Sequence, residues 1–191
     1  MTFQSAITSE LRIDGIADLS ATHRAFRLQG PGAATWLRAR GIDCPEALFA
    51  VRRNGEAEGS LLVARVGHGD VIIQERTGGG TLDRLEDALA PAVDVFRVPE
   101  ESATFRLSGS NVDTVWRQTC AIPLMDRPDD VIVYTRVAGV SCAVIPERES
   151  AGRCYRIWVD YSYAPGLWQT LAEILAEVGG SSPRSVKAGS N

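Results

Sequence analysis

The fold of this chain is decided by the stretch Phe105-Arg106-Leu107-Ser108-Gly109-Ser110-Asn111-Val112-Asp113-Thr114-Val115-Trp116, because the chain contains an earlier near-copy of it. The earlier copy reads Phe26-Arg27-Leu28-Gln29-Gly30-Pro31-Gly32-Ala33-Ala34-Thr35-Trp36, so Phe-Arg-Leu-x-Gly occurs twice. Each copy predicts a short strand with Phe and Leu on one face and Arg on the other, followed by a glycine turn and a helix. Since the elements after each copy also correspond, we predict a duplicated supersecondary unit.

The first copy opens a half in which apolar alternation, glycine turns and helical periodicity define six elements. The predicted order is strand, helix, strand, strand, helix, strand, which is the order of a ferredoxin-like unit. The elements are a strand at 26–29, a helix at about 31–40, a hairpin of 61–66 and 71–75 after a loop at 43–59, a helix after Gly78-Gly79-Gly80 with Thr81 as N-cap, and a strand at 93–98.

The second copy opens a half of similar composition. It predicts a strand at 104–107, a helix from Ser110 to about 120, a hairpin of 131–137 and 140–145, a strand at 155–159, and a helix from Pro165 to before Gly179. Residues 1–22 are predicted to form an irregular arm. The fold class is therefore α+β, with two duplicated ferredoxin-like βαββαβ-type units in one domain over residues 1–180, half-repeats at about 23–98 and 104–179, and a flexible tail at 181–191.

The composition excludes several classes of function. The 20 Lys and Arg residues are outnumbered by 24 Asp and Glu residues and form no basic stripe, so nucleic-acid binding is not expected. The N-terminus lacks the basic and apolar regions of a signal peptide, and no apolar run approaches the roughly 18 residues that a membrane span needs. We therefore expect a cytoplasmic protein without membrane contact.

Cysteine and histidine are too sparse to predict a metal site. Cys44, Cys120, Cys142 and Cys154 occur singly, and the chain has two histidines. The simplest interpretation is that the four cysteines are small core thiols of a reducing compartment. Neither a metal site nor a catalytic pair of nucleophile and histidine is predicted.

Three features remain as candidates for binding. Gly78-Gly79-Gly80-Thr81 could hold an anion on free N–H groups, although a turn with a capped helix is the simpler interpretation. Asp18 leads into the first repeated strand and is a candidate for ligand contact. Trp158 alternates out of phase with Tyr155 and Ile157, so it should face the other side of its sheet, where an outward ring could contact another subunit.

Five phrases of the sequence, taken together, are similar to known proteins. They are Asp18-Leu19-Ser20, the stretch at 26–37, the stretch at 105–109, Cys120-Ala121-Ile122-Pro123-Leu124, and Tyr161-Ser162-Tyr163-Ala164-Pro165-Gly166-Leu167-Trp168-Gln169-Thr170-Leu171. The first two resemble the opening of the glycine cleavage T-protein (aminomethyltransferase) superfamily. The others resemble one of its branches, the gamma subunit of heterotetrameric sarcosine oxidase. The resemblance covers roughly residues 13–180 and implies the T-protein-like folate-binding fold.

Two departures from the superfamily pattern concern folate. T-protein-like enzymes place an Asp near the middle hairpin, where this chain reads Gly55-Glu56-Ala57-Glu58-Gly59-Ser60-Leu61. They also hold the pterin with a Glu on a late strand, where this chain has Arg156 after Tyr155. Arginine carries only donors and cannot accept hydrogen bonds from a pterin. The resemblance thus implies ligand-binding residues at Asp18, Tyr155 and Arg156, but not folate binding of the family type.

The gamma-subunit branch offers a different expectation for the surface of the protein. As the resemblance implies, such a subunit carries no cofactor and packs against larger subunits that hold flavin, dinucleotide and folate. This chain has Pro123 where that branch tends to have Asp, and Tyr161 where it tends to have Arg. We predict that Trp158 and Tyr161 lie at a subunit interface.

Three hypotheses for function follow. The first is a non-catalytic, gamma-like structural subunit of a sarcosine oxidase-type complex with alpha, beta and delta partners, which oxidatively demethylates an N-methylated amine. This hypothesis predicts no cofactor on the chain itself and exposed apolar side chains on its contact face. The alternative is a stand-alone tetrahydrofolate-binding or folate-dependent aminomethyltransferase-like protein, with Asp18 and Tyr155 near the ligand. The third is an interaction domain that kept the fold and lost the pathway.

Overall fold

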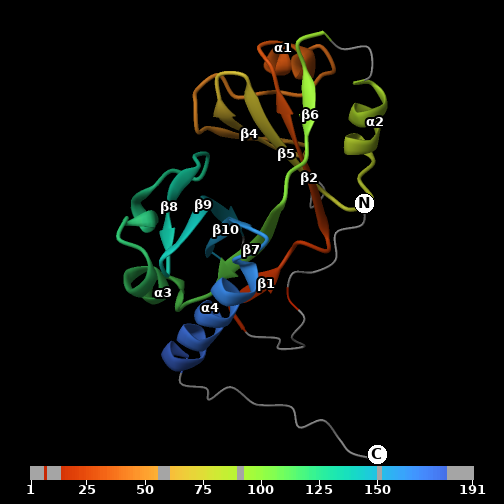
Figure 1. Ribbon diagram of the computed structural model, residues 1–191. Helices are drawn as coiled ribbons and strands as arrows, with labels where there is room; N and C mark the ends of the chain where they lie inside the picture. The colour runs from red at the N-terminus through yellow and green to blue at the C-terminus, as the bar shows by residue number, and fades with distance from the viewer. Residues whose placement is uncertain (1–6, 8–13, 56–60, 90–92, 150–151, 180–191) are drawn as a thin grey trace, which may run out of the picture.

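The computed structural model describes residues 7, 14–55, 61–89, 93–149 and 152–179. These residues form two five-stranded antiparallel sheets and four α-helices, which confirms the predicted α+β class (Figure 1). The predicted tail at 181–191 and the segment 56–60 lie outside the described residues. Of the helices in the described ranges, none combines the length and the apolar character that crossing a membrane requires.

The first unit contains a sheet with the strand order β3-β4-β5-β2-β6. Strand β2 carries the first Phe-Arg-Leu and lies inside the sheet, because it pairs antiparallel with both β5 and β6. Phe26 and Leu28 on this strand are buried against the helices, as the alternation predicts. The elements are β2 (His23–Gln29), α1 (Ala33–Arg38), β3 (Val51–Asn54), β4 (Leu61–Gly67), β5 (Asp70–Arg76), α2 (Thr81–Asp87) and β6 (Phe96–Val98).

The second unit contains a sheet with the order β8-β9-β10-β7-β1. Strand β7 carries the second Phe-Arg-Leu and pairs antiparallel with β10 on one side and with the N-terminal strand β1 on the other. The elements are β1 (Ile16–Asp18), β7 (Ser102–Ser108), α3 (Val112–Thr119), the 3-10 turn η1 (Leu124–Asp126), β8 (Val133–Val137), β9 (Val140–Glu149), β10 (Gly152–Asp160) and α4 (Ala164–Val178).

The two sheets share one strand order when β7 is matched to β2. β10 then corresponds to β5, β9 to β4 and β8 to β3, while β1 takes the place that β6 has in the first unit. The second unit therefore completes its ferredoxin-like order with a strand from the other end of the chain. The sequence predicted an irregular arm over 1–22, and this is wrong for Ile16–Asp18, where only three residues pair with β7.

Strand β3 is a second element that the sequence did not predict. A loop was expected over 43–59, because Val51 is the only apolar residue of Val51–Asn54 and the neighbouring residues are typical of a turn. The strand is an edge strand, held by its pairing with β4. Edge strands need little apolar alternation, since one side of their backbone has no sheet partner.

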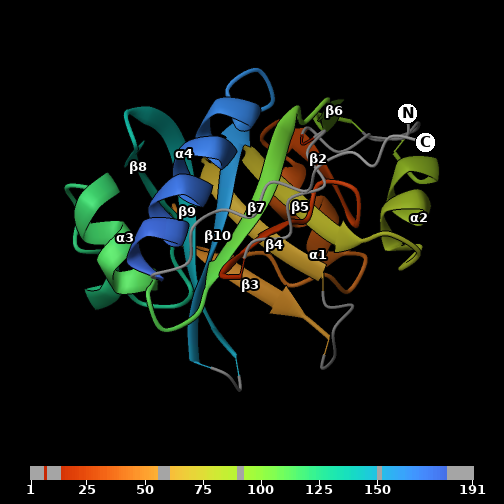
Figure 2. The same cartoon turned by 90° about the horizontal axis from the view of Figure 1, so that it is seen from below.

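The molecule is built in four layers, with the helices outside and the two sheets facing each other. Figure 2 shows α3 and α4 on one side, α2 on the other, and the sheets between them. Each sheet packs its helix-facing side chains into a core of its own. A third core lies between the sheets and consists of Val51, Leu62, Ala64, Ile72, Ile132, Ala143, Ile145 and Trp158.

Two backbone hydrogen bonds link the two units at one edge of this inter-sheet layer. Val51 N–H donates to the carbonyl of Asp130, and Ile132 N–H donates to the carbonyl of Phe49, both at 2.7 Å. Phe49 has φ 60°, a left-handed conformation that costs a residue with a side chain on the order of 1 kcal/mol. Its own N–H donates to Arg65 at 2.7 Å, so hydrogen bonds on both sides hold this conformation.

Two predicted helix caps differ from the structure. Thr81 is the first residue of α2 rather than its cap, and the N-cap position is occupied by Gly80 with φ 74°. The carboxylate of the buried Glu75 accepts hydrogen bonds from the N–H groups of Thr81 and Leu82, each at 3.0 Å. In the second unit, Asn111 rather than Ser110 precedes α3, and its side chain makes no capping hydrogen bond.

Candidate functional site

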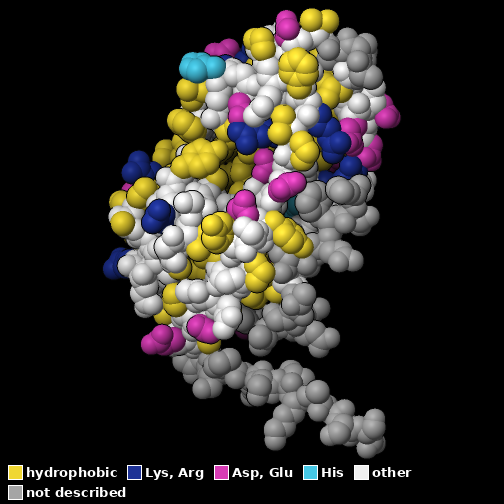
Figure 3. Space-filling model, viewed as in Figure 1, with side chains coloured by type: hydrophobic (Ala, Val, Ile, Leu, Met, Phe, Trp, Pro, Cys, Tyr) yellow, Lys and Arg dark blue, Asp and Glu magenta, His cyan; other side chains and the backbone are white. Residues whose placement is uncertain are grey.

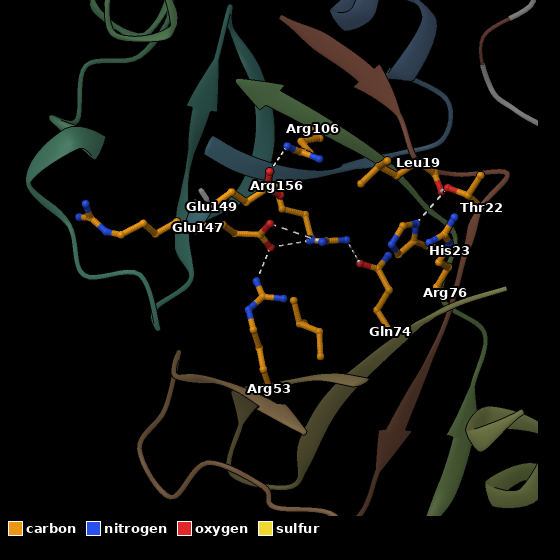
Figure 4. Close-up of a pocket in the computed structure, with 12 residues that line it drawn as sticks. Leu19, Thr22, His23, Arg53, Gln74, Arg76, Arg106, Glu147, Glu149 and Arg156 are labelled. Atoms are coloured by element: carbon orange, nitrogen blue, oxygen red, sulfur yellow. Dashed lines mark hydrogen bonds and ion pairs between the residues drawn. The ribbon is translucent and has the colours of Figure 1, made fainter. Parts of the chain in front are cut away.

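The Arg of each Phe-Arg-Leu motif points away from the helices and into the layer between the sheets. Arg106 lines a cavity of about 570 Å³ at one end of that layer, which we call the polar cavity (Figure 4). Its volume lies within the range of small-molecule sites. Five arginines, two glutamates, one histidine and four other residues line it: Leu19, Thr22, His23, Arg53, Leu62, Gln74, Arg76, Arg106, Glu147, Arg148, Glu149 and Arg156.

A buried ion pair forms the floor of the polar cavity. Arg156 on β10 is 8% exposed and Glu147 on β9 is 6% exposed. The Nε of Arg156 donates to one oxygen of Glu147 at 2.7 Å, and its Nη2 donates to the other at 3.4 Å. Arg53 of β3 donates to the same carboxylate from the first unit. Burial opposes ionisation of Glu147, but the two arginines outweigh it and hold the pKa of this carboxyl below its usual value.

Gln74 extends this network across the two sheets. Its side-chain oxygen accepts from Arg156 Nη1 at 2.8 Å and from Trp158 Nε1 at 3.4 Å. Its amide nitrogen donates to the hydroxyl of Thr104 at 2.8 Å. Because Gln74 belongs to the first unit and its partners to the second, the network fixes how the two sheets face each other. Each of the three guanidinium nitrogens of Arg156 thereby donates a hydrogen bond within the protein.

Arg106 is bound less completely. It forms an ion pair with Glu149, a residue on the exposed end of β9. Its Nε is buried and has no hydrogen-bond partner among the described residues. The thiol of Cys154 lies beside this guanidinium without bonding to Nε, and burial raises the pKa of that thiol to about 11. The polar cavity therefore contains a buried donor that the protein itself leaves unsatisfied.

Glu147, Glu149 and Cys154 also bring three possible metal-ligand atoms within 4.8 Å of one another. Both carboxylates are already paired with arginine, and the thiol is protonated at neutral pH. A metal ion would have to displace the arginines and deprotonate the thiol inside a cationic cavity. We therefore assign these three residues to the ion-pair network.

His23 is a partly buried ring that lies close to the cationic side chains of the polar cavity. The ring lies at the start of β2, next to Arg76 and facing Arg156 (Figure 4). Burial of the ring, followed by the positive charge of Arg156, lowers the pKa of His23 to about 4. The imidazole is therefore neutral at physiological pH and able both to donate and to accept a hydrogen bond.

The other end of the inter-sheet layer has a second cavity of about 560 Å³, which we call the apolar cavity. Its buried lining residues are apolar, namely Ile72, Cys142, Ala143 and Trp158, whereas its more exposed lining residues are mostly polar: Arg27, Glu100, Ser102, Tyr134, Thr135, Arg136 and Ser141. Arg27, the arginine of the first Phe-Arg-Leu, is in an ion pair with Asp70. Tyr134 is 52% exposed beside it and contacts the exposed ring of Phe49 edge to face at 5.7 Å. Figure 3 shows hydrophobic side chains gathered around a hollow between the two units.

The structure brings one of the three predicted ligand residues into the polar cavity. Arg156 lies there. Tyr155 does not, because it points to the helix side of its sheet, where it is 0% exposed and packs edge to face on Trp116 at 5.0 Å. Asp18 does not line the cavity either; its carboxylate accepts the N–H of Ser20 at 2.9 Å in a local turn. The three residues therefore do not line one cavity, and contact of Arg156 with a ligand stays a prediction.

The two predicted interface residues have different surroundings. Trp158 faces the opposite side of its sheet from Tyr155, as predicted, but that side is covered by the other sheet and the ring is only 5% exposed. The prediction of an outward ring is thus wrong, since the sequence does not reveal that both faces of β10 are buried. Tyr161 follows β10 and is 37% exposed, so its contact with a partner stays a prediction.

The glycine-rich turn before α2 does not provide an anion site. The N–H groups of Thr81 and Leu82 that could bind a phosphate are already bonded to Glu75. A side chain at Gly79 would place its Cβ 2.3 Å from the Glu75 carboxylate, so glycine is required there for the close approach. The simpler interpretation of this turn, a capped helix, therefore holds, with Glu75 as the cap.

Apart from Arg156, the residues that line the polar cavity were not identified as site residues by the sequence analysis. Glu147 falls in phase with Ala143 and Ile145 on β9, and Gln74 falls in phase with Ile72 on β5. A polar residue in the phase of an apolar face is a signal that could have indicated an internal network. Arg53 and His23 carried no such signal, because Arg53 lies on a strand without clear alternation and His23 precedes the alternating part of β2, which begins at Phe26.

Comparison with known proteins identifies the fold. The sequence matches no protein-family profile, and no curated protein is significantly similar to it. Among solved structures, the chain is similar to heterotetrameric sarcosine oxidase from Corynebacterium sp. U-96 in complex with pyrrole 2-carboxylate, with 18% identity and a TM-score of 0.68 over 90% of this chain and 87% of that chain. It is also similar to glycine cleavage system aminomethyltransferase T from Bartonella henselae, with 14% identity and a TM-score of 0.66 over 88% of this chain. The chain therefore has the T-protein-like fold that the resemblance implied, and it spans 46% of the transferase chain.

The residues of the polar cavity do not fit a pterin bound in the manner of that fold. A pterin held by its amide and amino donors needs a carboxylate with free acceptor positions. Both oxygens of Glu147 already accept hydrogen bonds from Arg156, and one also accepts from Arg53. Freeing this carboxylate would leave Arg156 buried without its counter-charge, which is costly.

Proposed function

We propose that this chain is a non-catalytic, gamma-like structural subunit of a cytoplasmic sarcosine oxidase-type complex that oxidatively demethylates an N-methylated amine. The observation that carries the proposal is the buried pair of Arg156 and Glu147, which fills the floor of the polar cavity with the protein's own charges. This pair occupies the carboxylate that a pterin would need as a hydrogen-bond acceptor. A structural subunit does not need such a carboxylate. The likeness to a chain of heterotetrameric sarcosine oxidase over 87% of its length supports the same choice.

The proposed partners are subunits of alpha, beta and delta type that carry the flavin, dinucleotide and folate, while this chain holds none of these cofactors. Exposed aromatic rings at Phe49, Tyr134 and Tyr161 offer apolar area for such contacts, with exposed fractions of 45%, 52% and 37%. Aromatic side chains of this kind are enriched at the centres of protein interfaces.

The test is co-expression of the tagged chain with alpha-, beta- and delta-type subunits. We expect one stable complex that carries flavin absorbance and in which an N-methylated amine reduces the flavin. Tyr161→Ala should weaken retention of the partners, whereas Phe96→Ala, on the exposed edge strand β6, is the matched control. The proposal would be contradicted if the flavin-bearing subunits were present and folded in the cells but did not purify together with the tagged chain.

The second candidate is a stand-alone tetrahydrofolate-binding or aminomethyltransferase-like protein. The observation in its favour is that the polar cavity has the volume of a ligand site and contains a buried carboxylate, Glu147. Calorimetric titration of the isolated chain with tetrahydrofolate separates the two proposals. Saturable binding at roughly micromolar concentration, lost in Glu147→Gln, would favour this candidate over the structural subunit.

A further inference from the structure

We propose that the polar cavity binds a small organic anion through a carboxylate or phosphate group, with Arg106 and Arg76 as the principal contacts. The cavity is lined by five arginines and two glutamates in a chain whose net charge is −4, and Arg148 among them is paired with Asp129 outside the lining. Guanidinium groups match the planar, two-oxygen geometry of carboxylate and phosphate. The inference goes beyond the proposed function, because it gives this chain a ligand of its own.

The charges do not all cancel within the protein. Arg53 and Arg156 share a single carboxylate, Glu147, which leaves one positive charge in excess at the floor. Arg106 has its ion pair with Glu149, but its buried Nε has no hydrogen-bond partner among the described residues. That Nε is sealed from solvent, so an anion in the cavity would contact the terminal nitrogens of Arg106.

His23 adds a neutral polar group to the lining of the cavity. Burial of the ring, and then the positive charge of Arg156, lower the pKa of His23, so the imidazole is uncharged at neutral pH. A neutral imidazole beside Arg76 adds a hydrogen-bond donor without adding to the repulsion among the cations. The ring is therefore suited to contact an oxyanion that the arginines attract.

The other end of the inter-sheet layer shows that the fold does not require these charges. When Phe26 is matched to Phe105, the strand register places Ile72 at the position of Arg156. Arg27 corresponds to Arg106 and is held by both oxygens of Asp70, with Nε at 2.6 Å from one of them. The same architecture thus folds with an apolar residue in place of Arg156, and the charge at the polar cavity needs another explanation.

The experiment is calorimetric titration of the isolated, folded chain with inorganic phosphate in one arm and succinate in the other, at constant ionic strength set with chloride. We expect saturable binding in at least one arm, with a dissociation constant below about 1 mM. The arm that binds identifies the group that the site takes. Binding in neither arm below about 10 mM overturns the proposal.

Matched variants locate the site. Arg106→Gln and Arg76→Gln should each weaken binding about tenfold or more, the loss expected for one charge-assisted hydrogen bond. Arg27→Gln removes the corresponding arginine at the apolar cavity and should leave binding unchanged. The assignment would be contradicted if Arg27→Gln weakened anion binding as much as the two polar-cavity variants do. It would also be contradicted if neither Arg106→Gln nor Arg76→Gln weakened binding. Since the measurement uses the chain alone, its outcome does not depend on whether partner subunits are found.

Discussion

The polar and apolar cavities are the two ends of one inter-sheet layer, and they differ in how each unit fills equivalent positions. The register matches Arg156 to Ile72 and Trp158 to Gln74, so each unit contributes one polar and one apolar side chain, in opposite order. As a result the polar pair, Arg156 and Gln74, meets at one end, and the apolar pair meets at the other. With the same strand order, the two units thus place a buried ion pair at one end of the layer and buried apolar side chains at the other.

The largest effect is expected from breaking the ion pair at the polar cavity. Glu147→Gln leaves Arg156 buried with no carboxylate, and loss of one partner of a buried pair costs about 3–5 kcal/mol. The free energy of unfolding, measured by urea denaturation, should fall by that amount. Glu149→Gln is the matched control, since its side chain is 38% exposed and its ion pair should contribute less than about 1 kcal/mol. Equal effects of the two variants would show that Glu147 is not a buried counter-charge.

The next prediction makes the polar cavity resemble the apolar one. The double variant Arg156→Ile with Glu147→Leu replaces the buried pair by apolar side chains, as Ile72 does at the other end. Such replacements are often neutral or stabilising by about 1–4 kcal/mol. Of the single variants, Glu147→Leu leaves Arg156 without a carboxylate, and Arg156→Ile leaves Glu147 with Arg53 as its remaining partner. Loss of Arg156 also leaves Gln74 without its 2.8 Å donor, so we expect the double variant to lie within about 2 kcal/mol of the parent protein.

A double-mutant cycle in urea measures this coupling. The sum of the two single losses should exceed the loss in the double variant by about 2 kcal/mol or more. Additive losses would mean that Arg156 and Glu147 stabilise the inter-sheet layer independently of each other. No pairing energy would then distinguish the polar end of the layer from the apolar end.

The third prediction concerns pH and the first residues of the repeated strands. His23 opens β2, and Ser102, which does not titrate, opens β7. The pKa of His23 is about 4 in the folded chain and 6.5 in the unfolded one, so between these values the unfolded chain binds more protons and stability rises with pH. The unfolding free energy should therefore fall by at most about 3 kcal/mol as pH drops through this window, less where solvent screens the half-buried ring.

The variant His23→Ser gives the first repeat the residue that the second repeat has at this position. Because it removes the titrating ring, the unfolding free energy should depend less on pH in this window. Arg76, Arg156 and Glu147 also act on the ring, but the arginines stay charged throughout the window. The pKa of Glu147 is held below its usual value, so its contribution to stability is lost as the pH falls through and below the usual glutamate value, and it adds to the slope only at the acid end of the window. Urea titrations at several pH values between 4 and 7 measure the slope. A slope unchanged in His23→Ser would show that another group titrates there.

The repeat itself was predictable from sequence, because it depends on local pattern. Phe26, Leu28, Phe105 and Leu107 alternate with arginine, and their burial against helices follows from alternation alone. The strand β1 was not predictable in this way, since Ile16–Asp18 pairs with β7, far along the chain, and has little apolar pattern of its own. Pairing over that distance is decided by the assembled units rather than by local residues.

The polar cavity shows why the candidate site was only partly predictable. The chain carries more acidic than basic residues and no basic stripe, so its arginines gave no signal of a cationic site. Five of them meet because strands from both units place them around one cavity. Arg156 was identified through a resemblance, but its partner Glu147 was not, because the pairing depends on the register between β9 and β10. Net charge constrains the field of the whole molecule and not the field inside a cavity.

The smallest effect is expected from the two arginines of the repeated motif. Arg27 pairs with Asp70 and Arg106 pairs with Glu149, and the side chains of the two acids are 20% and 38% exposed. Ion pairs at such partly exposed sites typically contribute about 0–1 kcal/mol. Arg27→Gln and Arg106→Gln should both lower the free energy of unfolding by no more than about 1 kcal/mol, with the larger loss for Arg27→Gln because Asp70 is the more buried acid. Thermal and urea denaturation of both variants provide the measurement. A larger loss in Arg106→Gln would mean that Arg106 contributes more to the stability of the fold than its partly exposed ion pair with Glu149 accounts for.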